Sequence, residues 1–534
     1  MTDFVPNFVS HEHPQQAACG ERIVRRLQEH GYEAVFAGGC VRDALRGAPV
    51  KDIDIATSAT PDQIAELFPA QSVGVGKSFG VMLVIVDGVS FDVATFRTDG
   101  GYQDGRHPES VAFDSAEHDA LRRDFTVNAL FYDPVAQRIV DYTGGEDDLK
   151  AGIVRAVGNP VTRFREDRLR MLRAVRFAAV CGWKIESATW EALCAEAPAL
   201  GCVSAERIRT EFVRMLCESP VPSKAMDMLL ASGLLREFFP EVVRLKGCLQ
   251  DPQWHPEGDV WNHTCKMLDL QPAPRDPELV WSVLLHDIGK PDALRVGTKP
   301  DGSPWYRTPG HADIGAEMAP GILRRFKEKR ETIDRVTAAV RHHMQFVELP
   351  RMRTTTARKM LGRDTMPLEL ELHRLDCLSS HAKLDLYTLA KETIASYANE
   401  PILPPAIVTG KLLIGLGWKP GPAMGNLLKK LYERQLEGEG RLALYTSVFD
   451  VAPCRSRSGR TNVAFEIYPG DTFELRPLWD RLCSESAWNV LLVVGLGVTW
   501  TEPYNPQRRL YRLVGDCAGN AELPDLSAYI RLGC

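Results

Sequence analysis

Residues 38–57, GGCVRDALRGAPVKDIDIAT, decide the fold of the N-terminal part of this 534-residue chain. An apolar stretch, residues 32–37, ends in the two glycines, and the segment VRDAL directly after them has helical spacing. Residues 51–57, KDIDIAT, belong to a set of segments that alternate or run apolar between glycine-containing turns, which is typical of a strand. Strand, glycine turn, helix and strand in this order predict a small sheet with helices packed on it.

The strand predicted at 51–57 carries two acids. Asp52 and Asp54 are two residues apart, so in an extended chain their carboxylates lie on one face, about 6 to 7 Å apart. Because like charges this close repel one another, a cation between them would stabilise the pair, and Mg²⁺ prefers such oxygen ligands. Asp92, inside the predicted strand FDVATFR, is a candidate third catalytic carboxylate. The alternative for the pair alone is a polar strand edge.

The turn before this strand has the features of a phosphate site. Gly38 and Gly39 let the backbone approach a triphosphate, and the next helix begins with free N–H groups. The guanidinium of Arg42 adds a positive charge that can donate two hydrogen bonds to a phosphate. The turn matches neither G-x-x-x-x-G-K-[ST] nor G-x-G-x-x-G. Neither a P-loop nor a Rossmann fold is therefore favoured.

The rest of the chain divides by its pattern of apolar residues. Residues 80–87 and 89–97 read as further strands of the same sheet. From about 153 to about 436, apolar periods of three and four predict helices. The predicted fold class is α+β, with a small head on a long, all-helical neck and body. Residues 441–534 hold no motif that assigns them.

Four ordered motifs carry a family resemblance. They are GGCVRDALRGAPVKDIDIAT (38–57), DGRHPESV (104–111), RRDFTVNAL (122–130) and EDRLRMLRAVRFA (166–178). Over roughly residues 20–440 the chain resembles the class II tRNA nucleotidyltransferase and bacterial poly(A) polymerase family, in particular CCA-adding enzymes that bear an HD domain. The resemblance implies a DNA polymerase β-like nucleotidyltransferase head that extends tRNA with CTP and ATP.

The resemblance also implies roles for single residues. Asp52 and Asp54 would hold Mg²⁺, and Gly39 and Arg42 would bind the incoming triphosphate. The residues expected to bind the nucleotide are Gly38, Gly39, Arg42, Arg123, Asp124, Asn128, Asp167, Arg170, Arg173 and Arg176.

The neck motif has a chemistry of its own. Asp167 and Arg170 are predicted to lie on one helix as neighbours, three residues apart. The carboxylate can accept from an exocyclic amino group while the guanidinium donates to the adjacent ring nitrogen, a pattern that fits cytosine and adenine and rejects guanine and uracil. The alternative is an ordinary surface ion pair.

Histidines gather in the body, with eight of the thirteen between His255 and His381. Their order resembles the HD phosphohydrolase superfamily, whose ligands converge on one or two divalent ions. The predicted ligands are His263, His286, Asp287, His311, His342, His343 and Asp376. Imidazoles and carboxylates suit Mn²⁺, Ni²⁺ or Fe. The nearby Trp254, Trp261 and Trp281 are expected in the core.

The expected divisions are an N-terminal tail (1–19), the head (20–152), a helical neck with an RNA-binding region (153–245), the HD domain (246–385), a helical tail segment (386–440) and the unassigned extension (441–534). Thirteen scattered cysteines without C-x-x-C, and no signal-like N-terminus or long apolar run, predict a cytoplasmic protein with no membrane partner. The sequence leaves the oligomeric state open.

Three functions remain open at this stage. The first is addition or repair of the tRNA CCA end, together with a phosphohydrolase activity. The second is a poly(A) polymerase, or an enzyme that adds only CC or only A. The net charge of −6 disfavours processive tailing of varied RNAs, which would favour a broadly basic surface. The third is an HD phosphohydrolase whose head binds RNA without polymerising.

Overall fold

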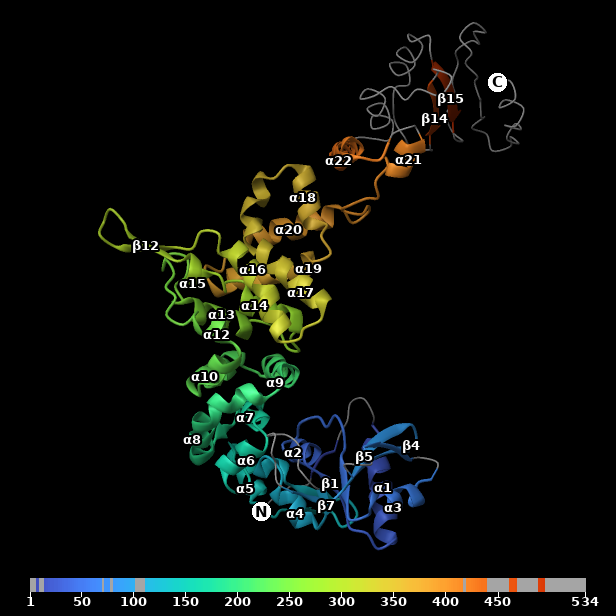
Figure 1. Cartoon of the computed structure of the whole chain (residues 1–534), viewed down its shortest axis with the longest axis vertical. Coiled ribbons are helices and arrows are strands. Elements are labelled where there is room, and N and C mark those ends of the chain that lie inside the picture. Colours follow the sequence, from blue (N-terminus) through green and yellow to red (C-terminus); the bar gives the residue numbers. More distant parts are fainter. Residues whose placement is uncertain are drawn as a thin grey trace, which may run out of the picture. The chain divides into compact units, whose positions relative to one another are not determined.

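The computed structural model describes residues 6–8, 14–69, 72–76, 80–100, 111–415, 419–438, 461–467 and 488–494 (Figure 1). The chain forms two compact units, residues 1–346 with 367–387 and residues 347–366 with 388–534. The motif at 104–111 lies outside the described residues except for its last position. So does the C-terminal extension, apart from β14 (Thr461–Ile467) and β15 (Trp488–Val494), which pair in parallel.

The head is built on a seven-stranded mixed sheet. The strands, in spatial order, are β3 (Ser72–Gly76), β4 (Val81–Val86), β5 (Val89–Thr95), β2 (Ile55–Thr57), β1 (Ala34–Ala37), β8 (Phe131–Asp133) and β9 (Arg138–Val140). Only β2 and β5 pair in parallel, with Ile55 opposite Val93. A separate hairpin joins β6 (Arg97–Asp99) to β7 (Val111–Phe113).

Short helices flank the head sheet. They are α1 (Gln16–Glu29), α2 (Gly39–Leu45), α3 (Pro61–Leu67), α4 (Ala116–Leu121), α5 (Gly145–Ala151) and the 3₁₀ turn η2 (Thr126–Asn128). Ile23, Val24 and Leu27 of α1 are buried in the same core as Phe36 of β1. A capping box at Thr60 starts α3. The predicted head of strands and helices is confirmed.

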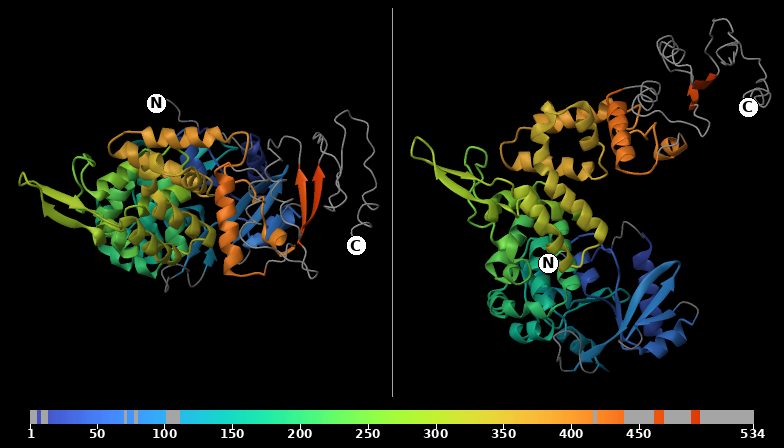
Figure 2. Two further views of the ribbon diagram at one scale, coloured as in Figure 1. Left: turned by 90° about the horizontal axis from the view of Figure 1, so that it is seen from above. Right: turned by 45° about the horizontal axis from the view of Figure 1, so that its top comes forward.

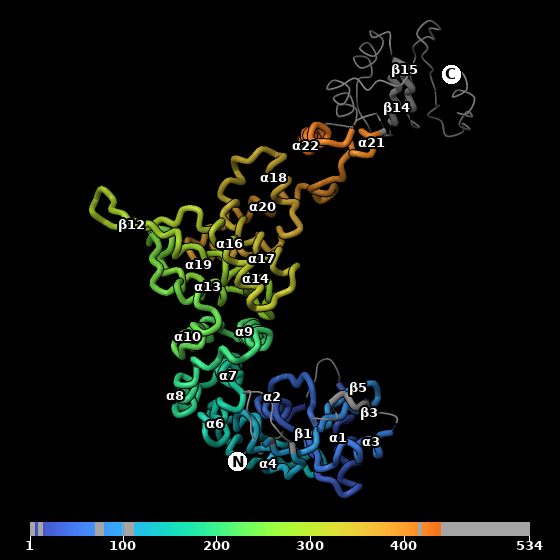
Figure 3. Tube along the Cα trace, viewed as in Figure 1, coloured from blue at the N-terminus to red at the C-terminus, as the bar shows by residue number. Residues whose placement is uncertain are grey.

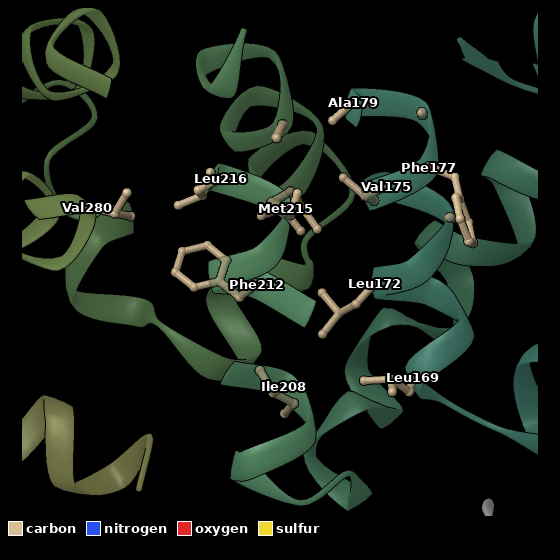
Figure 4. Close-up of a cluster of buried hydrophobic side chains, with 14 of the residues drawn as sticks. Leu169, Leu172, Val175, Phe177, Ala179, Ile208, Phe212, Met215, Leu216 and Val280 are labelled. Atoms are coloured by element: carbon tan, nitrogen blue, oxygen red, sulfur yellow. The ribbon is translucent and has the colours of Figure 1, made fainter. Parts of the chain in front are cut away.

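The neck is helical and begins after the head. Its helices are α6 (Pro160–Glu166), α7 (Leu169–Cys181), α8 (Ser187–Glu196), α9 (Ala205–Glu218), α10 (Pro222–Ala231), α11 (Leu234–Phe238) and α12 (Pro240–Val243). A parallel pair, β10 (Ile153–Val154) and β11 (Lys184–Ile185), lies among them. Leu172 and Val175 of α7 face Phe212 and Met215 of α9 in a fully buried cluster (Figure 4). Each such side chain contributes about 1.5–3 kcal/mol by its burial.

The neck motif does not form one helix, and the prediction that it does was wrong. Helix α6 ends at Glu166, Asp167 has extended backbone angles (φ −142°, ψ 106°), and α7 begins at Leu169. The Asp167 carboxylate accepts a hydrogen bond from the backbone N–H of Leu169 at 3.1 Å. A short acidic side chain that binds nearby backbone N–H groups favours a helix boundary over a helix interior.

The body continues the first unit (Figure 3). Its elements are α13 (Val260–Asp269), α14 (Pro277–Leu285), α15 (Lys290–Ala293), β12 (Arg295–Thr298), β13 (Pro304–Arg307), α16 (His311–Arg325), α17 (Arg330–His342), the start of the 3₁₀ segment η4 (His343–Arg351) and, from residue 367 on, α19 (Met366–Ser379). Helix α14 is apolar on all sides and buried from Leu279 onward. Trp261 and Trp281 lie in the core as expected, but Trp254 is 52% exposed, so that prediction was wrong.

The second unit contains α18 (Thr354–Leu361), part of α20 (Asp385–Ser396), α21 (Gly410–Gly415) and α22 (Pro422–Leu436). A small core of Val408, Leu413, Leu427 and Leu431 joins α21 to α22. Among the described residues, no helix is both long and apolar enough to cross a lipid bilayer. The cysteines that the structure describes carry free thiols.

Candidate active site and metal centre

The acid pair of the head lies on one face of an extended segment. Ile53 and Ile55 are buried while Asp52 and Asp54 reach solvent, so the predicted alternation is confirmed, although β2 proper begins only at Ile55. In the parallel register, Asp54 directly precedes Ile55 and Asp92 directly precedes Val93. Asp54 and Asp92 therefore lie on neighbouring strands.

Negative charge accumulates at Asp54. Surrounding protein atoms and the nearby charges of Asp92 and Asp52 raise the pKa of its carboxyl to about 6, although Arg123 opposes them. Burial is the largest cause of this rise, and the part due to Asp92 and Asp52 reflects negative charge that Arg123 does not fully balance. A divalent cation would balance it, so the acids present fit a metal with oxygen ligands.

A cavity of about 1040 Å³ joins these acids to the neck. Of the predicted head and neck residues, all but Asp92 line it. They are Gly38, Gly39, Arg42, Asp52, Asp54, Arg123, Asp124, Asn128, Asp167, Arg170, Arg173 and Arg176. The structure thus brings the acid pair and both parts of the neck motif to a single cavity.

Two features make glycine necessary at position 38. Its φ of +75° lies in the left-handed region, and a Cβ there would lie 2.6 Å from Nη1 of Arg123. That guanidinium donates to the carbonyl of Asn128 at 3.0 Å and pairs with Asp119 at 3.0 Å. The turn and Arg123 are therefore fixed together.

A chain of hydrogen bonds runs from the turn helix α2 to the neck. Arg42 donates to Oδ1 of Asn128 at 2.5 Å, Nδ2 of Asn128 donates to Asp124 at 2.9 Å, and Nε of Arg173 donates to Asp124 at 2.8 Å. Burial acts to raise the pKa of Asp124, but Arg173 and Asn128 lower it to about 2. Asp124 is therefore a charged link between head and neck.

Glu211 of α9 extends this chain of hydrogen bonds. The buried Arg176 donates to its carboxylate at 2.6 Å, and Arg173 lies 3.8 Å from it. Sequence reasoning missed Glu211. Its signal is an acid on the apolar face of α9, beside the buried Ile208 and Phe212.

The side chains of Asp167 and Arg170 do not pair with each other, although the backbone N–H of Arg170 donates to the carbonyl of Asp167 at 3.0 Å. Asp167 accepts from Arg207 of α9 at 2.8 Å, whereas Arg170 pairs with Glu166 at 2.7 Å and donates to the carbonyl of Arg122 at 3.2 Å. Both side chains still line the cavity. Arg207 was another residue that sequence reasoning missed.

The body gathers a second set of ligands. His286, His311 and His343 each place Nδ1 at 2.7–2.9 Å from a backbone carbonyl three residues earlier, that of Val283, Thr308 and Val340 respectively. A carbonyl can only accept, so Nδ1 carries the proton and Nε2 of a neutral ring offers its lone pair. These Nε2 atoms converge.

Six side chains form two adjoining groups, His263 with His286 and Asp376, and Asp287 with His311 and His343. Within each group the ligand atoms lie within 4.8 Å of one another. Nε2 of His311 is 3.1 Å from Nε2 of His343 and 3.3 Å from Asp287, and Nε2 of His263 is 3.2 Å from Asp376. We call these six residues the HD cluster.

The HD cluster fits a divalent metal. The buried Nε2 atoms of His263 and His286 make no well-aligned hydrogen bond to any described residue, and each has a carboxylate beside it, Asp376 at 3.2 Å and Asp287 at 3.1 Å respectively. Burial and the neighbouring His286 and His311 lower the pKa of His343 to about 3, so this ring is neutral and able to ligate. Two facing nitrogen lone pairs with carboxylates beside them suit one or two divalent ions.

The structure does not bring His342 to the HD cluster. Its Nδ1 instead lies 3.3 Å from Glu369, since successive residues at a helix end point in different directions. Two other residues were missed. Glu257 lies 2.6 Å from Nδ1 of His263 and orients that ring, and Lys290 lies 2.6 Å from Asp287.

Comparisons with known proteins agree with this arrangement. Three family models match in order: the poly A polymerase head domain (residues 34–155), the probable RNA and SrmB- binding site of polymerase A (residues 182–245) and the HD domain (residues 260–379). The matches cover the acid pair, part of the neck and the HD cluster.

Similar curated proteins include several named CCA-adding enzyme. The CCA-adding enzyme of Lactobacillus delbrueckii subsp. bulgaricus is 32% identical over 418 residues, which cover 78% of this chain and 93% of that protein. The CCA-adding enzyme of Geobacillus thermodenitrificans is 45% identical over 222 residues, 41% of this chain, and that match spans about half, 54%, of the relative.

Among solved structures, the Bacillus stearothermophilus CCA-adding enzyme in complex with CTP superposes with a TM-score of 0.61 at 27% identity. The superposition covers 82% of this chain and 97% of that one. The Thermotoga maritima CCA-adding enzyme complexed with tRNA_CCA, at 20% identity and a TM-score of 0.51, shares the fold.

Proposed function

The chain belongs to the CCA-adding enzyme family, and from this premise we propose that it adds or repairs the 3′-terminal CCA of tRNA. The substrates would be CTP, ATP and tRNA, and pyrophosphate would be released. The observation that carries the proposal is the single cavity lined by the acid pair, the glycine turn and the neck motif. It fits one nucleotide held between a metal site and a group that can read its base.

In this proposal, Asp52 and Asp54 hold Mg²⁺, with Asp92 as the neighbouring catalytic acid. A bound Mg²⁺ lowers the pKa of an attacking hydroxyl and neutralises phosphate charge. The glycine turn admits the triphosphate, and Arg42 and Arg123 offer forked cations to it. The RNA 3′-hydroxyl attacks the α-phosphate in line, and pyrophosphate leaves.

Base selection falls to the neck. Asp167 would accept from the exocyclic amino group and Arg170 would donate to the adjacent ring nitrogen, which distinguishes C and A from G and U by about 1–3 kcal/mol per contact. Both side chains now have protein partners, Arg207 and Glu166, so they must exchange them when a nucleotide binds. Arg173, which binds Asp124, and Arg176, which binds Glu211, also line the cavity and would complete the site.

One incubation tests this function. The protein and Mg²⁺ are mixed with tRNA that lacks its last three nucleotides, and labelled CTP and ATP are offered separately and together. CCA addition gives two C residues with CTP alone and one further A when both are present. Long ATP-only tails would indicate a poly(A) polymerase, and products that stop at CC or accept only A would indicate a partial enzyme.

Variants of the acids test the metal assignment. Asp52→Ala and Asp54→Ala should each lower incorporation by at least about 1000-fold, equivalent to about 4 kcal/mol, while thermal unfolding stays near wild type. Asp147→Ala, which removes an exposed acid of α5, is the control. Retained turnover by either active-site variant would overturn the role of the pair.

A second activity is favoured by the HD cluster itself. We propose a metal-dependent hydrolysis of phosphoesters or of 2′,3′-cyclic phosphate ends, with Mn²⁺, Ni²⁺ or Fe as the metal. Protein dialysed against a chelator should regain phosphatase activity when Ni²⁺ or Mn²⁺ is added. Hydrolysis without any extension of tRNA would instead favour an HD phosphohydrolase with a non-polymerising, RNA-binding head.

A further inference from the structure

A short hairpin, β12 and β13, projects from the body (Figures 1 and 2). Strands β12 and β13 pair antiparallel, with Arg295 opposite Arg307 and Gly297 opposite Trp305. Residues two apart in a strand share a face, so these four residues lie on the same face of the hairpin. Nothing in the proposed functions uses this face.

Two like charges oppose each other on it. Arg295 and Arg307 are both exposed, and a like-charged pair directly across two strands destabilises the hairpin. Within the described part of the chain neither guanidinium forms an ion pair, whereas Lys299 pairs with Asp251 at 3.5 Å. The arrangement is favourable when an anion lies between the two arginines.

An aromatic ring extends the same face. A Cβ at Gly297 would lie 2.4 Å from the ring of Trp305, so the indole lies directly against the strand backbone. The guanidinium of Arg307 stacks over this ring, 5.1 Å from its centroid. Because Arg307 covers this ring, a nucleic-acid base stacks on the indole when the guanidinium moves from the ring to the phosphate.

The hairpin is joined to the HD cluster at both ends. Asp287 precedes it through α15, and His311 follows Arg307 after only Thr308, Pro309 and Gly310. Four residues of extended chain span at most about 14 Å, so Arg307 lies within that distance of a cluster ligand. A strand of RNA held on the hairpin would therefore lie near the HD cluster.

We propose that the hairpin is an RNA-binding arm. Arg295 and Arg307 bind a backbone phosphate, Trp305 stacks a base, and the bound strand is guided toward the HD cluster. RNA is the occupant because the face combines unpaired forked cations with a stacking ring, which an acidic protein surface would not need. The role in guidance rests on the HD activity proposed above, whereas RNA binding by the arm does not.

Photo-crosslinking tests the binding directly. The full-length protein, free of added metal, is irradiated with tRNA that carries 4-thiouridine, and crosslinked peptides are identified by mass spectrometry. We expect an adduct on residues 295–307 that Arg295→Gln with Arg307→Gln abolishes. The control, Arg25→Gln with Arg330→Gln, removes equal charge from exposed arginines of α1 and α17 and should leave the adduct unchanged.

Affinity and hydrolysis supply independent readouts. In the hairpin variant, the slope of log K against log salt for tRNA should become shallower by about 0.7–0.9, the value for one lost phosphate contact. Metal-dependent hydrolysis of an RNA ending in a 2′,3′-cyclic phosphate should show a KM raised at least about 10-fold, with a small chromogenic phosphodiester cleaved as before.

The outcomes separate the two proposals. A wild-type protein that extends and binds tRNA but gives no adduct on the hairpin, or a variant with an unchanged salt slope, overturns the arm alone. An adduct on the hairpin without metal-dependent hydrolysis overturns the HD activity and leaves the arm as an RNA-binding surface.

Discussion

At the scale of single residues, Asp54 is the group whose ionisation most directly reports the state of the head site. The folded protein raises the pKa of its carboxyl to about 6, above the value of about 3.9 in an unfolded chain. Metal-free folded protein thus holds the Asp54 proton more tightly than unfolded protein does. The resulting stabilisation is complete below about pH 4 and is lost as the pH rises through 6.

We therefore expect the free energy of unfolding in EDTA to fall between pH 4 and pH 6. The contribution of Asp54 to this fall should be about 1 kcal/mol or less, because solvent screens the exposed carboxylate. Urea unfolding of wild type and Asp54→Asn at several pH values isolates the contribution, since the variant cannot titrate there. Parallel curves for the two proteins would refute the raised pKa. Asp147→Asn should match wild type throughout.

Adjacent histidines offer a matched pair for the HD cluster. His343 has its Nε2 3.1 Å from that of His311, whereas His342 faces Glu369. Replacing His343 by Ala should weaken divalent-metal binding at least about 100-fold, because loss of even a ligand's orienting partner costs 10–100-fold. His342→Ala should retain the metal. Elemental analysis after dialysis measures both, and equal metal content in the two variants would contradict the assignment.

At the scale of elements, the turn between β1 and α2 requires glycine at position 38 for two separate reasons. Its backbone is left-handed, and a Cβ there would meet Arg123 at 2.6 Å. Gly47 is also left-handed, at φ +68°, but a Cβ there would meet nothing within 4 Å. Comparing alanine substitutions at these two glycines therefore distinguishes the cost of backbone strain from the effect of displacing Arg123.

Gly38→Ala should lower both thermal stability and nucleotide incorporation, the latter at least about 10-fold, because Arg123 must leave the cavity wall. Gly47→Ala should cost only the about 1–2 kcal/mol of a left-handed alanine and leave kcat nearly unchanged. Calorimetry and primer extension on both variants measure the difference. Equal losses of activity would show that Arg123 is not the residue displaced.

Some features of these elements could be predicted from the sequence, and others could not. The alternation at 52–55 predicts which of these side chains face solvent because one buried face fixes the parity of a strand, whereas Ala56 and Thr57 are both buried. The break at Asp167 could not be predicted from apolar spacing, since α6 and α7 each bury their own face and only the capping bond of Asp167 separates them. In the same way, Arg207 reaches the cavity from α9 and Glu211 of the same helix binds Arg176, and no local pattern connects α9 to the head.

At the scale of the first compact unit, head and neck are joined by charge as well as by packing. The carboxylate of Asp124 accepts from Asn128 of the head and from Arg173 of the neck, and Glu211 of α9 lies behind that arginine. Base recognition and catalysis come from different elements, so this link sets the distance between them. A break in it should affect the reaction more than the fold.

A double-mutant cycle tests that link. Asp124→Asn and Arg173→Gln should each cost about 2 to 4 kcal/mol of stability, because either leaves a desolvated charge without its partner. The double variant should cost less than their sum, with a coupling energy of at least about 1 kcal/mol. The exposed pair Arg244 and Asp292 is the control and should couple by less than about 0.5 kcal/mol.

Because the link positions the neck over the head, both single variants should also lower the discrimination of CTP and ATP against GTP and UTP. Additive stabilities with unchanged nucleotide choice would mean that packing of α7 alone holds the neck in place.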